Sequence, residues 1–365
     1  MRSALVTTVN PVDPKQGDEW RAYGLLKGLE SLGEVDLVQW GGRLGGSHRI
    51  IPDTGLKRAL RAVPGLVVGP PFGSLPYRVA LPHEPHDAYD IVAAYPLKAA
   101  RWALRVPGRL HLLDLTDSLG MLRGSLPALY RGQRFRLFGA GREELALGRR
   151  FSECWVASST DADYLRARGL DTVVVPNGAK VRRPLPWADP RRLLFVGNLA
   201  YPPNRRGLLS FLRDVWPSIG SRGYHLDLVG RGTEEWAQGS TPHVAGHGRV
   251  EDLEPWYRSH GIVICPVEVS AGTPSKVLEA LGFGRPVVAW ASGIRGLSEE
   301  EAAVVLPVRQ DDEWYPAIAR LQDRAEWERI ARLAPGSVAL WGEPQAARLQ
   351  ELIGSLFSTR SPEFR

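Results

Sequence analysis

Residues 268–289 read EVSAGTPSKVLEALGFGRPVVA, and this stretch indicates how the chain folds. It follows the apolar run Ile262–Pro266, which predicts a buried strand. A Gly-Thr-Pro-Ser turn then leads into a helix predicted over Lys276–Gly282, and Pro286–Ala289 predicts the next strand. A strand, a helix and a second strand in this order are typical of a parallel sheet covered by helices.

The same alternation of apolar runs and amphipathic stretches extends over most of the chain. It predicts strands at Ser3–Val9, Val35–Gln39, Ile91–Ala94, Leu110–Leu115, Cys154–Ser158, Thr172–Val175, Arg192–Val196 and His225–Val229, and helices at Glu19–Leu32, Gly207–Trp216 and Leu253–Ser259. It is interrupted at Asn177–Asp189, where glycine and prolines indicate a linker. We therefore predict an α/β protein with two doubly wound, Rossmann-like domains, residues 1–180 and 181–343, and a C-terminal helix over 344–357 that packs back on the first. Ligands are expected beyond the carboxyl ends of the strands, in a cleft between the domains.

The composition is that of a globular protein with a full core. The chain has 365 residues, of which 44% are hydrophobic and 24% are charged. Its formal net charge of +6 favours anionic partners such as nucleotides or phospholipids. Cys154 and Cys265 lie in apolar runs, so we expect buried thiols and no zinc site. Neither a secretory signal nor an apolar run of the ~18 residues that a membrane span requires is visible, so the expected location is cytoplasmic.

The turn before the predicted helix at Lys276 has the features of an anion-binding site. Backbone N–H groups around Gly272 and Thr273, together with the positive end of the helix dipole, would face an anion, and Lys276 adds a positive charge. Glu279, about one turn further along, suits the two hydroxyls of a ribose. The alternative is a local ion pair between Lys276 and Glu279 in a helix that binds no ligand.

A second strand, turn and helix are predicted at residues 193–209, LLFVGNLAYPPNRRGLL. Gly197 permits close approach of the backbone to a ligand. Asn204 is predicted to cap the helix, with Arg205 and Arg206 in its first turn, where they would reach a diphosphate. The alternative for both arginines is a solvated surface, since arginine is frequent throughout this chain.

Two glycine-containing turns follow other strands. LDLVGRGTE, residues 226–234, matches part of a dinucleotide-binding fingerprint, but the full GxGxxG pattern is absent, so nicotinamide binding is weakly supported. NPVDPKQGDEWR, residues 10–21, follows the first strand. It places Gly17 and Asp18 at the N-terminus of the first helix, facing the expected cleft.

The stretch HLLDLTDS, residues 111–118, ends a predicted strand of the first domain. Alternation puts Asp114 and Thr116 on one face, with Asp117 near the strand end. Asp117 either orients an acceptor hydroxyl or a sugar in the cleft, or caps the segment that follows.

Taken in order, these stretches resemble those of the retaining glycosyltransferases of family 4, most of all a bacterial branch often found with exopolysaccharide gene clusters. The matching segments are Pro11–Arg21, Val174–Gly178, Gly197–Asn204 and Gly272–Ala280. The resemblance spans nearly the whole chain. It implies the GT-B fold, with two Rossmann-like domains facing across a cleft. It also implies transfer of a sugar from a nucleotide-diphosphate donor to an acceptor hydroxyl with retention of the anomeric configuration.

The resemblance also implies a role for each candidate residue. These are Glu279 for the ribose; Asn204, Arg205, Arg206, Gly272, Thr273 and Lys276 for the donor diphosphate; Gly230, Arg231 and Val250 for the base; and Asp117, Gly17 and Asp18 for catalysis. No metal or other cofactor is implied. Arginine, lysine and helix dipoles would then offset the charge that develops on the leaving diphosphate.

Two positions depart from the family's pattern. A glutamate often stands eight residues before the one that matches Glu279, and this chain has Ala271 there, with Glu268 as the nearest substitute. A histidine often precedes the aspartate that matches Asp117, and this chain has Thr116, which cannot carry a proton at neutral pH. Both changes bear on the choice of sugar and on activation of the acceptor.

Three classes of function are open on the sequence: a glycosyltransferase, a GT-B epimerase of nucleotide sugars, and a non-catalytic nucleotide- or polysaccharide-binding protein. The first is favoured because Lys276 and Glu279 are intact and few acid–base side chains are available to an epimerase. The expected partners are a nucleotide-sugar donor and a sugar, lipid-linked or small-molecule acceptor, and no nucleic acid. A basic stretch at residues 131–150 either contacts anionic lipid at the inner membrane face or is a solvated helix face. The proline-rich stretch Gly45–Pro85 is predicted to be a loop.

Overall fold

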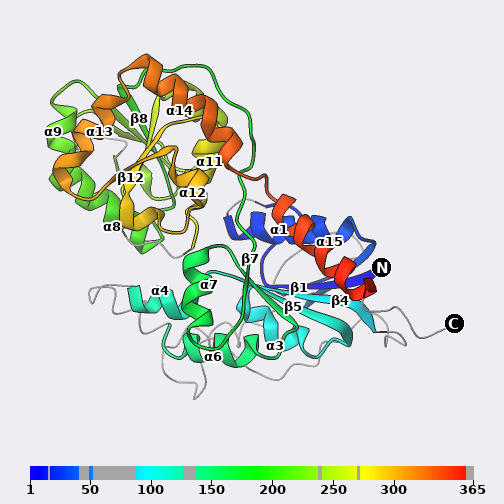
Figure 1. Ribbon diagram of the computed structural model, residues 1–365. Helices are drawn as coiled ribbons and strands as arrows, with labels where there is room; N and C mark the ends of the chain where they lie inside the picture. Colours follow the sequence, from blue (N-terminus) through cyan, green and yellow to red (C-terminus); the bar gives the residue numbers. More distant parts are fainter. Residues whose placement is uncertain are drawn as a thin grey trace. The chain divides into compact units, whose positions relative to one another are not determined.

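The computed structural model describes residues 1–14, 17–40, 49–51, 88–125, 137–236, 241–268 and 272–358 (Figure 1). The chain forms two compact units: unit 1 comprises Met1–Asn177 and Trp341–Arg365, and unit 2 comprises Gly178–Leu340. The chain passes from one unit to the other after Asn177 and after Leu340, in each case three residues before the boundary predicted at 180 or 343. Of the helices within the described ranges, none has the length and apolar character that a membrane span requires.

Unit 1 is built on a parallel sheet. Its strands, over the described residues, are β1 (Arg2–Thr7), β2 (Glu34–Trp40), β3 (Arg49–Ile51), β4 (Tyr89–Tyr95), β5 (Gly108–Thr116), β6 (Glu153–Val156) and β7 (Val173–Val174). Their order across the sheet is β3-β2-β1-β4-β5-β6-β7. Because β1 pairs with β2 on one side and with β4 on the other, the chain runs outward in two directions from the β1–β4 junction. Such a switch point is where doubly wound sheets bind ligands.

Helices cover both faces of this sheet. They are α1 (Gly17–Glu30), α3 (Ala100–Ala103), α4 (Leu119–Ser125), α6 (Ala140–Gly148), α7 (Ser159–Arg166) and α15 (Glu343–Ser358). The alternation along β1 sends Leu5 into the core beneath α1 and α15, and Val6 into the core beneath α3, α6 and α7. Helices α1 and α15 run side by side (Figure 1). Gly28 permits this approach, because a Cβ there would lie 2.9 Å from Cδ1 of Leu349.

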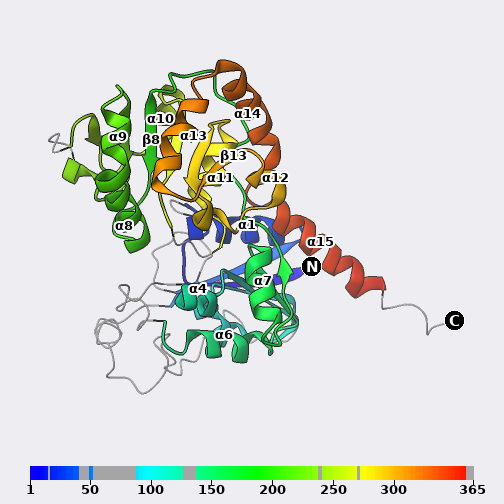
Figure 2. The ribbon, with the colours of Figure 1, turned by 60° about the vertical axis from the view of Figure 1, so that its left-hand side comes forward.

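Unit 2 has a second parallel sheet, with the order β10-β9-β8-β11-β12-β13. Its strands are β8 (Arg192–Val196), β9 (His225–Val229), β10 (Val244–Gly246), β11 (Ile262–Cys265), β12 (Val287–Trp290) and β13 (Val305–Val308). Its helices are α8 (Pro202–Ser210), α9 (Trp216–Gly220), α10 (Glu254–Ser259), α11 (Ser275–Gly282), α12 (Glu299–Ala302), α13 (Trp314–Arg320) and α14 (Arg324–Ser337). Figure 2 shows α8 and α9 on one side of the strands and α14 on the other. The switch point of this unit lies between β8 and β11.

The predicted fold class, an α/β protein with two doubly wound parallel sheets, is confirmed. The short strands β3, β10 and β13 were not predicted. The helix predicted over Gly207–Trp216 had the wrong bounds. It begins earlier, at Pro202, because proline is well tolerated in the first turn of a helix, and a π-helical turn at Phe211–Val215 separates α8 from α9.

Candidate functional site

The loops at the switch point of unit 2 approach one another closely. Gly207 of α8 faces the end of β11, and a Cβ there would lie 2.1 Å from the carbonyl oxygen of Pro266. Gly230 follows β9 with φ of +130°, and a Cβ there would lie 2.1 Å from the carbonyl oxygen of Gly197. Glycine at both positions therefore allows the segments after β8, β9 and β11 to converge.

Gly207→Ala is expected to lower the free energy of unfolding by about 1–3 kcal/mol, because the added methyl group forces α8 away from the end of β11. Thermal or urea unfolding measures this change. Gly336→Ala is the matched control, because no atom lies within 4 Å of a Cβ at that position of α14. If the two variants were equally stable, close packing of α8 on β11 would not be required.

Helix α11 begins directly after the loop that follows β11. Gly272, with φ of +61°, makes the turn, and the buried Thr273 donates from Oγ1 to the carbonyl oxygen of Gly296 at 3.0 Å. The N-cap residue is Pro274, which gives the helix no side-chain hydrogen bond. The first N–H groups of α11 are therefore not capped by this residue and suit an anion. Lys276, which is half-buried, lies in the same first turn.

Glu279 lies one turn after Lys276 and is held by Tyr257 of α10. The Tyr257 hydroxyl donates to Oε2 of Glu279 at 3.3 Å. Burial raises the pKa of Glu279, and the positive charge of Lys180 and the Tyr257 hydrogen bond oppose this rise only in part. Lys276 and Glu279 are both described and form no ion pair with each other, and the positive charge that acts on Glu279 is that of Lys180. The local pair considered from the sequence is therefore not formed.

Tyr257 is itself fixed in position, and sequence reasoning missed it. Its ring is fully buried and stacks on that of Phe283, with 4.8 Å between the ring centroids. Its carbonyl oxygen accepts a hydrogen bond from Nε of the buried Arg285 at 2.6 Å. Burial lowers the pKa of Arg285 to about 10, and its guanidinium lies 5.2 Å from the ring centre of Trp327. The carboxylate of Glu279 thus rests on a rigid, buried support.

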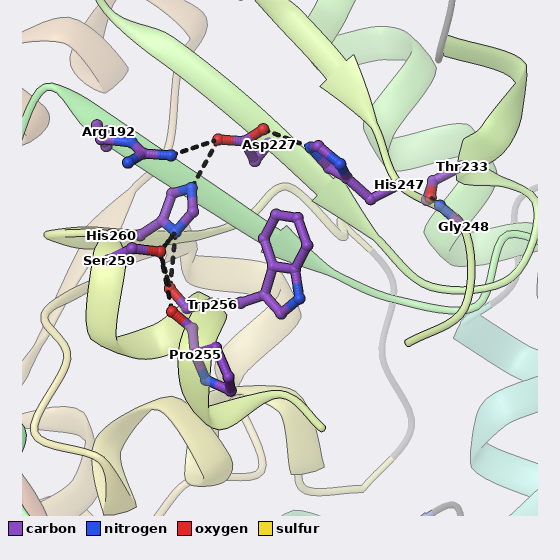
Figure 3. Close-up of polar contacts among 9 residues, drawn as sticks. All are labelled: Arg192, Asp227, Thr233, His247, Gly248, Pro255, Trp256, Ser259 and His260. Atoms are coloured by element: carbon purple, nitrogen blue, oxygen red, sulfur yellow. Dashed lines mark hydrogen bonds and ion pairs between the residues drawn. The ribbon is translucent and has the colours of Figure 1, made fainter. Parts of the chain in front are cut away.

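The residues predicted to contact the base lie in two turns that are hydrogen-bonded to each other. Gly230 N donates to the carbonyl oxygen of Gly248 at 2.8 Å, and Gly248 N donates to Oγ1 of Thr233 at 2.9 Å (Figure 3). Arg231 is exposed, and Val250 is half-buried and packs against the core of unit 2. The turn after β9 and the segment after β10 are therefore joined to each other by hydrogen bonds.

The prediction that Asn204 caps α8 is wrong. The helix begins at Pro202 with Tyr201 as its N-cap, so Asn204 lies inside the first turn. Its side chain is buried, and Nδ2 donates to the carbonyl oxygen of Asn198 at 3.0 Å. Its Oδ1 has no hydrogen-bond partner within the described ranges. A role of Asn204 at the donor diphosphate stays a prediction.

Arg205 and Arg206 follow Asn204 in α8, and both are exposed. Arg205 forms an ion pair with Glu235, with 3.1 Å between Nη1 and Oε1. Exposed pairs of this kind are weak, so Glu235 does not prevent Arg205 from turning toward an anion. The diphosphate role of both arginines also stays a prediction.

In unit 1, Asp117 lies directly after β5 in a strained turn. Thr116 has φ of +63°, a left-handed conformation that β-branched residues rarely adopt. The Asp117 residue is half-buried, but its Oδ1 is enclosed and has no hydrogen-bond partner in the part of the chain that is described. Burial and the charge of Asp161 raise the pKa of Asp117 to about 7, against the opposing charge of Arg21. Backbone strain beside a perturbed acid is typical of functional sites.

The N-terminus of α4, which follows Asp117, is bound by other residues. Ser118 Oγ accepts from Met121 N at 3.1 Å, and Oε2 of the buried Glu144 accepts from Leu119 N at 2.8 Å. Burial raises the pKa of Glu144 to about 7. The alternative in which Asp117 caps the next segment is therefore not what the structure shows.

A buried ion pair in unit 1 was not predicted from the sequence. Nε of Arg21, in α1, lies 2.8 Å from Oδ2 of Asp114, in β5, and both side chains are buried. Arg21 also donates to Oδ1 of Asn177 at 3.0 Å. Asp114 is therefore part of the structural frame. Gly17 and Asp18 form the first turn of α1 with an exposed Asp18, and their catalytic role stays a prediction.

Three stretches discussed from the sequence lie partly or wholly outside the described residues. They are the segment that contains Ala271, the proline-rich stretch Gly45–Pro85 apart from β3, and the basic residues 131–136. Next to the last of these, Phe138 is 65% exposed. The guanidinium of Arg123 lies 5.5 Å from the centre of its ring.

The segment that holds Gly230, Gly272 and Glu279 has recognisable relatives. Residues 190–324 match the family Glycosyl transferases group 1. The match lies within unit 2, and its bounds include α8, α10 and α11. No curated protein sequence matches the chain.

Solved structures share the fold over nearly the whole chain. HepE of Anabaena, solved with UDP, superposes with a TM-score of 0.63 at 14% identity, over 98% of this chain and 100% of HepE. WaaG, a glycosyltransferase involved in lipopolysaccharide biosynthesis, superposes with a TM-score of 0.61 at 14% identity, over 95% of this chain and 98% of WaaG. TarM superposes with a TM-score of 0.56 at 10% identity, over 73% of this chain. The chain spans about half (54%) of the length of TarM. At this level of identity the likeness shows the fold, and the predicted GT-B fold is confirmed.

Proposed function

We propose that the protein is a glycosyltransferase that moves a sugar from a nucleotide-diphosphate donor to an acceptor hydroxyl. The observation that carries this proposal is the Glu279 carboxylate, held by Tyr257 one turn behind the start of α11, where the N-cap residue Pro274 gives no side-chain hydrogen bond. A fixed, half-buried carboxylate suits two ribose hydroxyls, and a helix N-terminus with Lys276 suits a diphosphate. The match of residues 190–324 to Glycosyl transferases group 1 supports the same function.

Each unit has its own part in this proposal. In unit 2, the diphosphate would be bound by Asn204, Arg205, Arg206, Gly272, Thr273 and Lys276, and the base by Gly230, Arg231 and Val250. In unit 1, Asp117 would accept a hydrogen bond from the attacking hydroxyl, and Gly17 and Asp18 complete the proposed catalytic set. The enclosed Oδ1 of Asp117 and its raised pKa support this role.

We further infer retention of the anomeric configuration, membership of family 4 and a role in polysaccharide or glycoconjugate biosynthesis, all on the resemblance of the ordered motifs. No metal is required in this proposal, because the α11 dipole, Lys276 and the arginines of α8 would offset the charge on the leaving diphosphate. A lipid-linked acceptor would be reached by peripheral contact with the inner membrane face. The exposed Phe138 beside Arg123 supports such a contact.

A thermal-shift screen with UDP, GDP, dTDP and ADP tests the donor site. A ligand at ~100 times its dissociation constant adds about 2.7 kcal/mol to the free energy of unfolding, which raises the melting temperature measurably. We expect one nucleoside diphosphate to stabilise the protein, and UDP is the first to test because HepE was solved with it. If none of the four stabilises the folded protein at millimolar concentration, the proposal of a nucleotide-dependent transferase is wrong.

A further inference from the structure

A charged cluster lies among the strands of unit 2, close to the proposed nucleoside site. At its centre is Asp227 of β9, whose side chain is 13% exposed (Figure 3). Oδ2 lies 2.7 Å from Nε2 of His260, Oδ1 lies 2.5 Å from Nε2 of His247, and Nη2 of Arg192 lies 3.4 Å from Oδ2. Burial disfavours the charged form of Asp227, but the hydrogen bonds from both histidines outweigh it and hold the pKa of this carboxyl well below its usual value.

His260 ties this aspartate to helix α10. The imidazole is fully buried, and its Nδ1 lies 2.7 Å from the carbonyl oxygen of Trp256. The carbonyl oxygen of Trp256 and the carboxylate of Asp227 can both only accept, so the ring donates to the two together only as an imidazolium, with an N–H on each nitrogen. The last turn of α10 is thereby fastened to β9. Tyr257, the residue after Trp256, carries the hydroxyl that holds Glu279.

His247 ties the same aspartate to the segment after β10. Its ring lies beside that of Trp256, with 4.3 Å between the centroids (Figure 3). The next residue, Gly248, accepts from Gly230 N and donates to Thr233. Movement of His247 would therefore shift the two hydrogen-bonded turns that hold Gly230 and Val250, residues that are proposed to contact the base.

We propose that Asp227, acting through His260 and His247, is a positioning residue for the nucleoside of the donor. One carboxylate fixes both the backbone proposed to contact the base and the helix that holds the ribose carboxylate. The contact between Asp227 and His260 is the buried part of this cluster, and a buried polar pair is a costly way to join a helix to a sheet, since apolar residues would serve stability as well. This inference rests on the proposed function. It does not involve Gly272, Thr273 or Lys276, so the diphosphate should bind independently of Asp227.

Calorimetric titration of Asp227→Asn tests this separation, with inorganic pyrophosphate and with UDP, or whichever of GDP, dTDP and ADP stabilises the wild type. We expect the nucleoside diphosphate to bind about tenfold more weakly or worse, because charge-assisted hydrogen bonds that order both segments are lost. The affinity for pyrophosphate should stay within about twofold of wild type. Asp214→Asn is the matched control, because Asp214 forms an ion pair with the neighbouring Arg213 at the surface of the same unit.

His247→Phe is a second variant that keeps an aromatic ring beside Trp256 but cannot reach Asp227 by hydrogen bonding. It should weaken the binding of the nucleoside diphosphate and leave that of pyrophosphate unchanged. It tests the positioning role if Asp227→Asn does not fold. Equal losses for pyrophosphate and nucleotide, or unchanged binding of both, would overturn the positioning role. If the wild type binds pyrophosphate but no nucleoside diphosphate, the proposed function fails, and this inference fails with it.

Discussion

Replacing Asp117 by asparagine is expected to slow sugar transfer by about 10²–10⁴-fold, the usual contribution of a general base. The carboxylate would accept the proton of the attacking hydroxyl, which an amide cannot do. The strained Thr116 precedes this group, and the buried Oδ1 of Asp117 has no hydrogen-bond partner among the described residues. Because the nucleotide is proposed to bind to unit 2, its affinity should stay within about twofold of wild type.

The pH dependence of this reaction has a definite sign. Since burial raises the pKa of Asp117 to about 7, the transfer rate should rise with pH through about 7 and then level off, and this rise should vanish in Asp117→Asn. Stability changes in the opposite direction. The carboxyl ionises at about 3.9 in the unfolded chain, so its contribution to the free energy of unfolding is full below about 4 and is lost as the pH rises toward the folded value.

Initial rates across the pH range, with nucleotide affinity measured in parallel, check this prediction. Asp163→Asn is the matched control, because Asp163 is an exposed residue of α7 in the same unit and pairs with Arg166. A variant Asp117→Asn that keeps the wild-type rate and pH profile would remove Asp117 from the catalytic residues. That result would leave the assigned fold and the proposed nucleotide site unchanged.

Glu279→Gln is expected to weaken nucleoside-diphosphate binding by about 10²-fold. Two hydrogen bonds from ribose hydroxyls to a charged carboxylate contribute about 3 kcal/mol in total, and 1.4 kcal/mol corresponds to a factor of ten. The wild type should therefore prefer UDP over 2′-deoxy-UDP, if uracil is the base, and the variant should lose this preference. Glu328→Gln, on the exposed face of α14, is the matched control.

The same variant is expected to melt at a higher temperature than the wild type when no ligand is present. Burial raises the pKa of Glu279, so its charged form is less favourable in the folded protein than in the unfolded chain. The resulting loss of stability sets in as the pH rises through the pKa of the unfolded carboxyl, and it is complete above the folded value. A lower melting temperature together with unchanged nucleotide binding would identify Glu279 as a structural residue.

The strand and helix alternation was enough to predict the fold, because parallel sheets buried on both faces leave continuous apolar runs in the sequence. Arg192–Val196 and His225–Val229 coincide with β8 and β9. The strands that escaped prediction are short: β3 and β10 have three residues each. Runs of that length carry no periodicity that distinguishes a strand from a loop.

The site was predictable only where its residues share one local segment. The turn at Gly272, Lys276 and Glu279 could be placed because helix spacing alone puts them within one or two turns. Tyr257 could not be assigned to Glu279, since the two stand on different helices and tertiary packing decides which buried groups meet. Arg21 and Asp114 are 93 residues apart, and no local pattern links them. The prediction of a cap at Asn204 was wrong because α8 begins two residues earlier, with prolines in its first two positions.

The chain passes from unit 1 to unit 2 and back at two points that lie beside each other. Ala179 N donates to the carbonyl oxygen of Ala339 at 2.7 Å, and Ala179 pairs with Leu340 in a parallel bridge. Residues 178–340 are therefore one continuous insertion whose ends meet, an arrangement that tolerates circular permutation and exchange of the inserted part. Unit 2, which is proposed to recognise the donor, can thus be exchanged as one continuous segment. Under the proposed function, we expect that exchanging residues 178–340 between related glycosyltransferases alters donor choice and leaves the acceptor proposed for unit 1 unchanged.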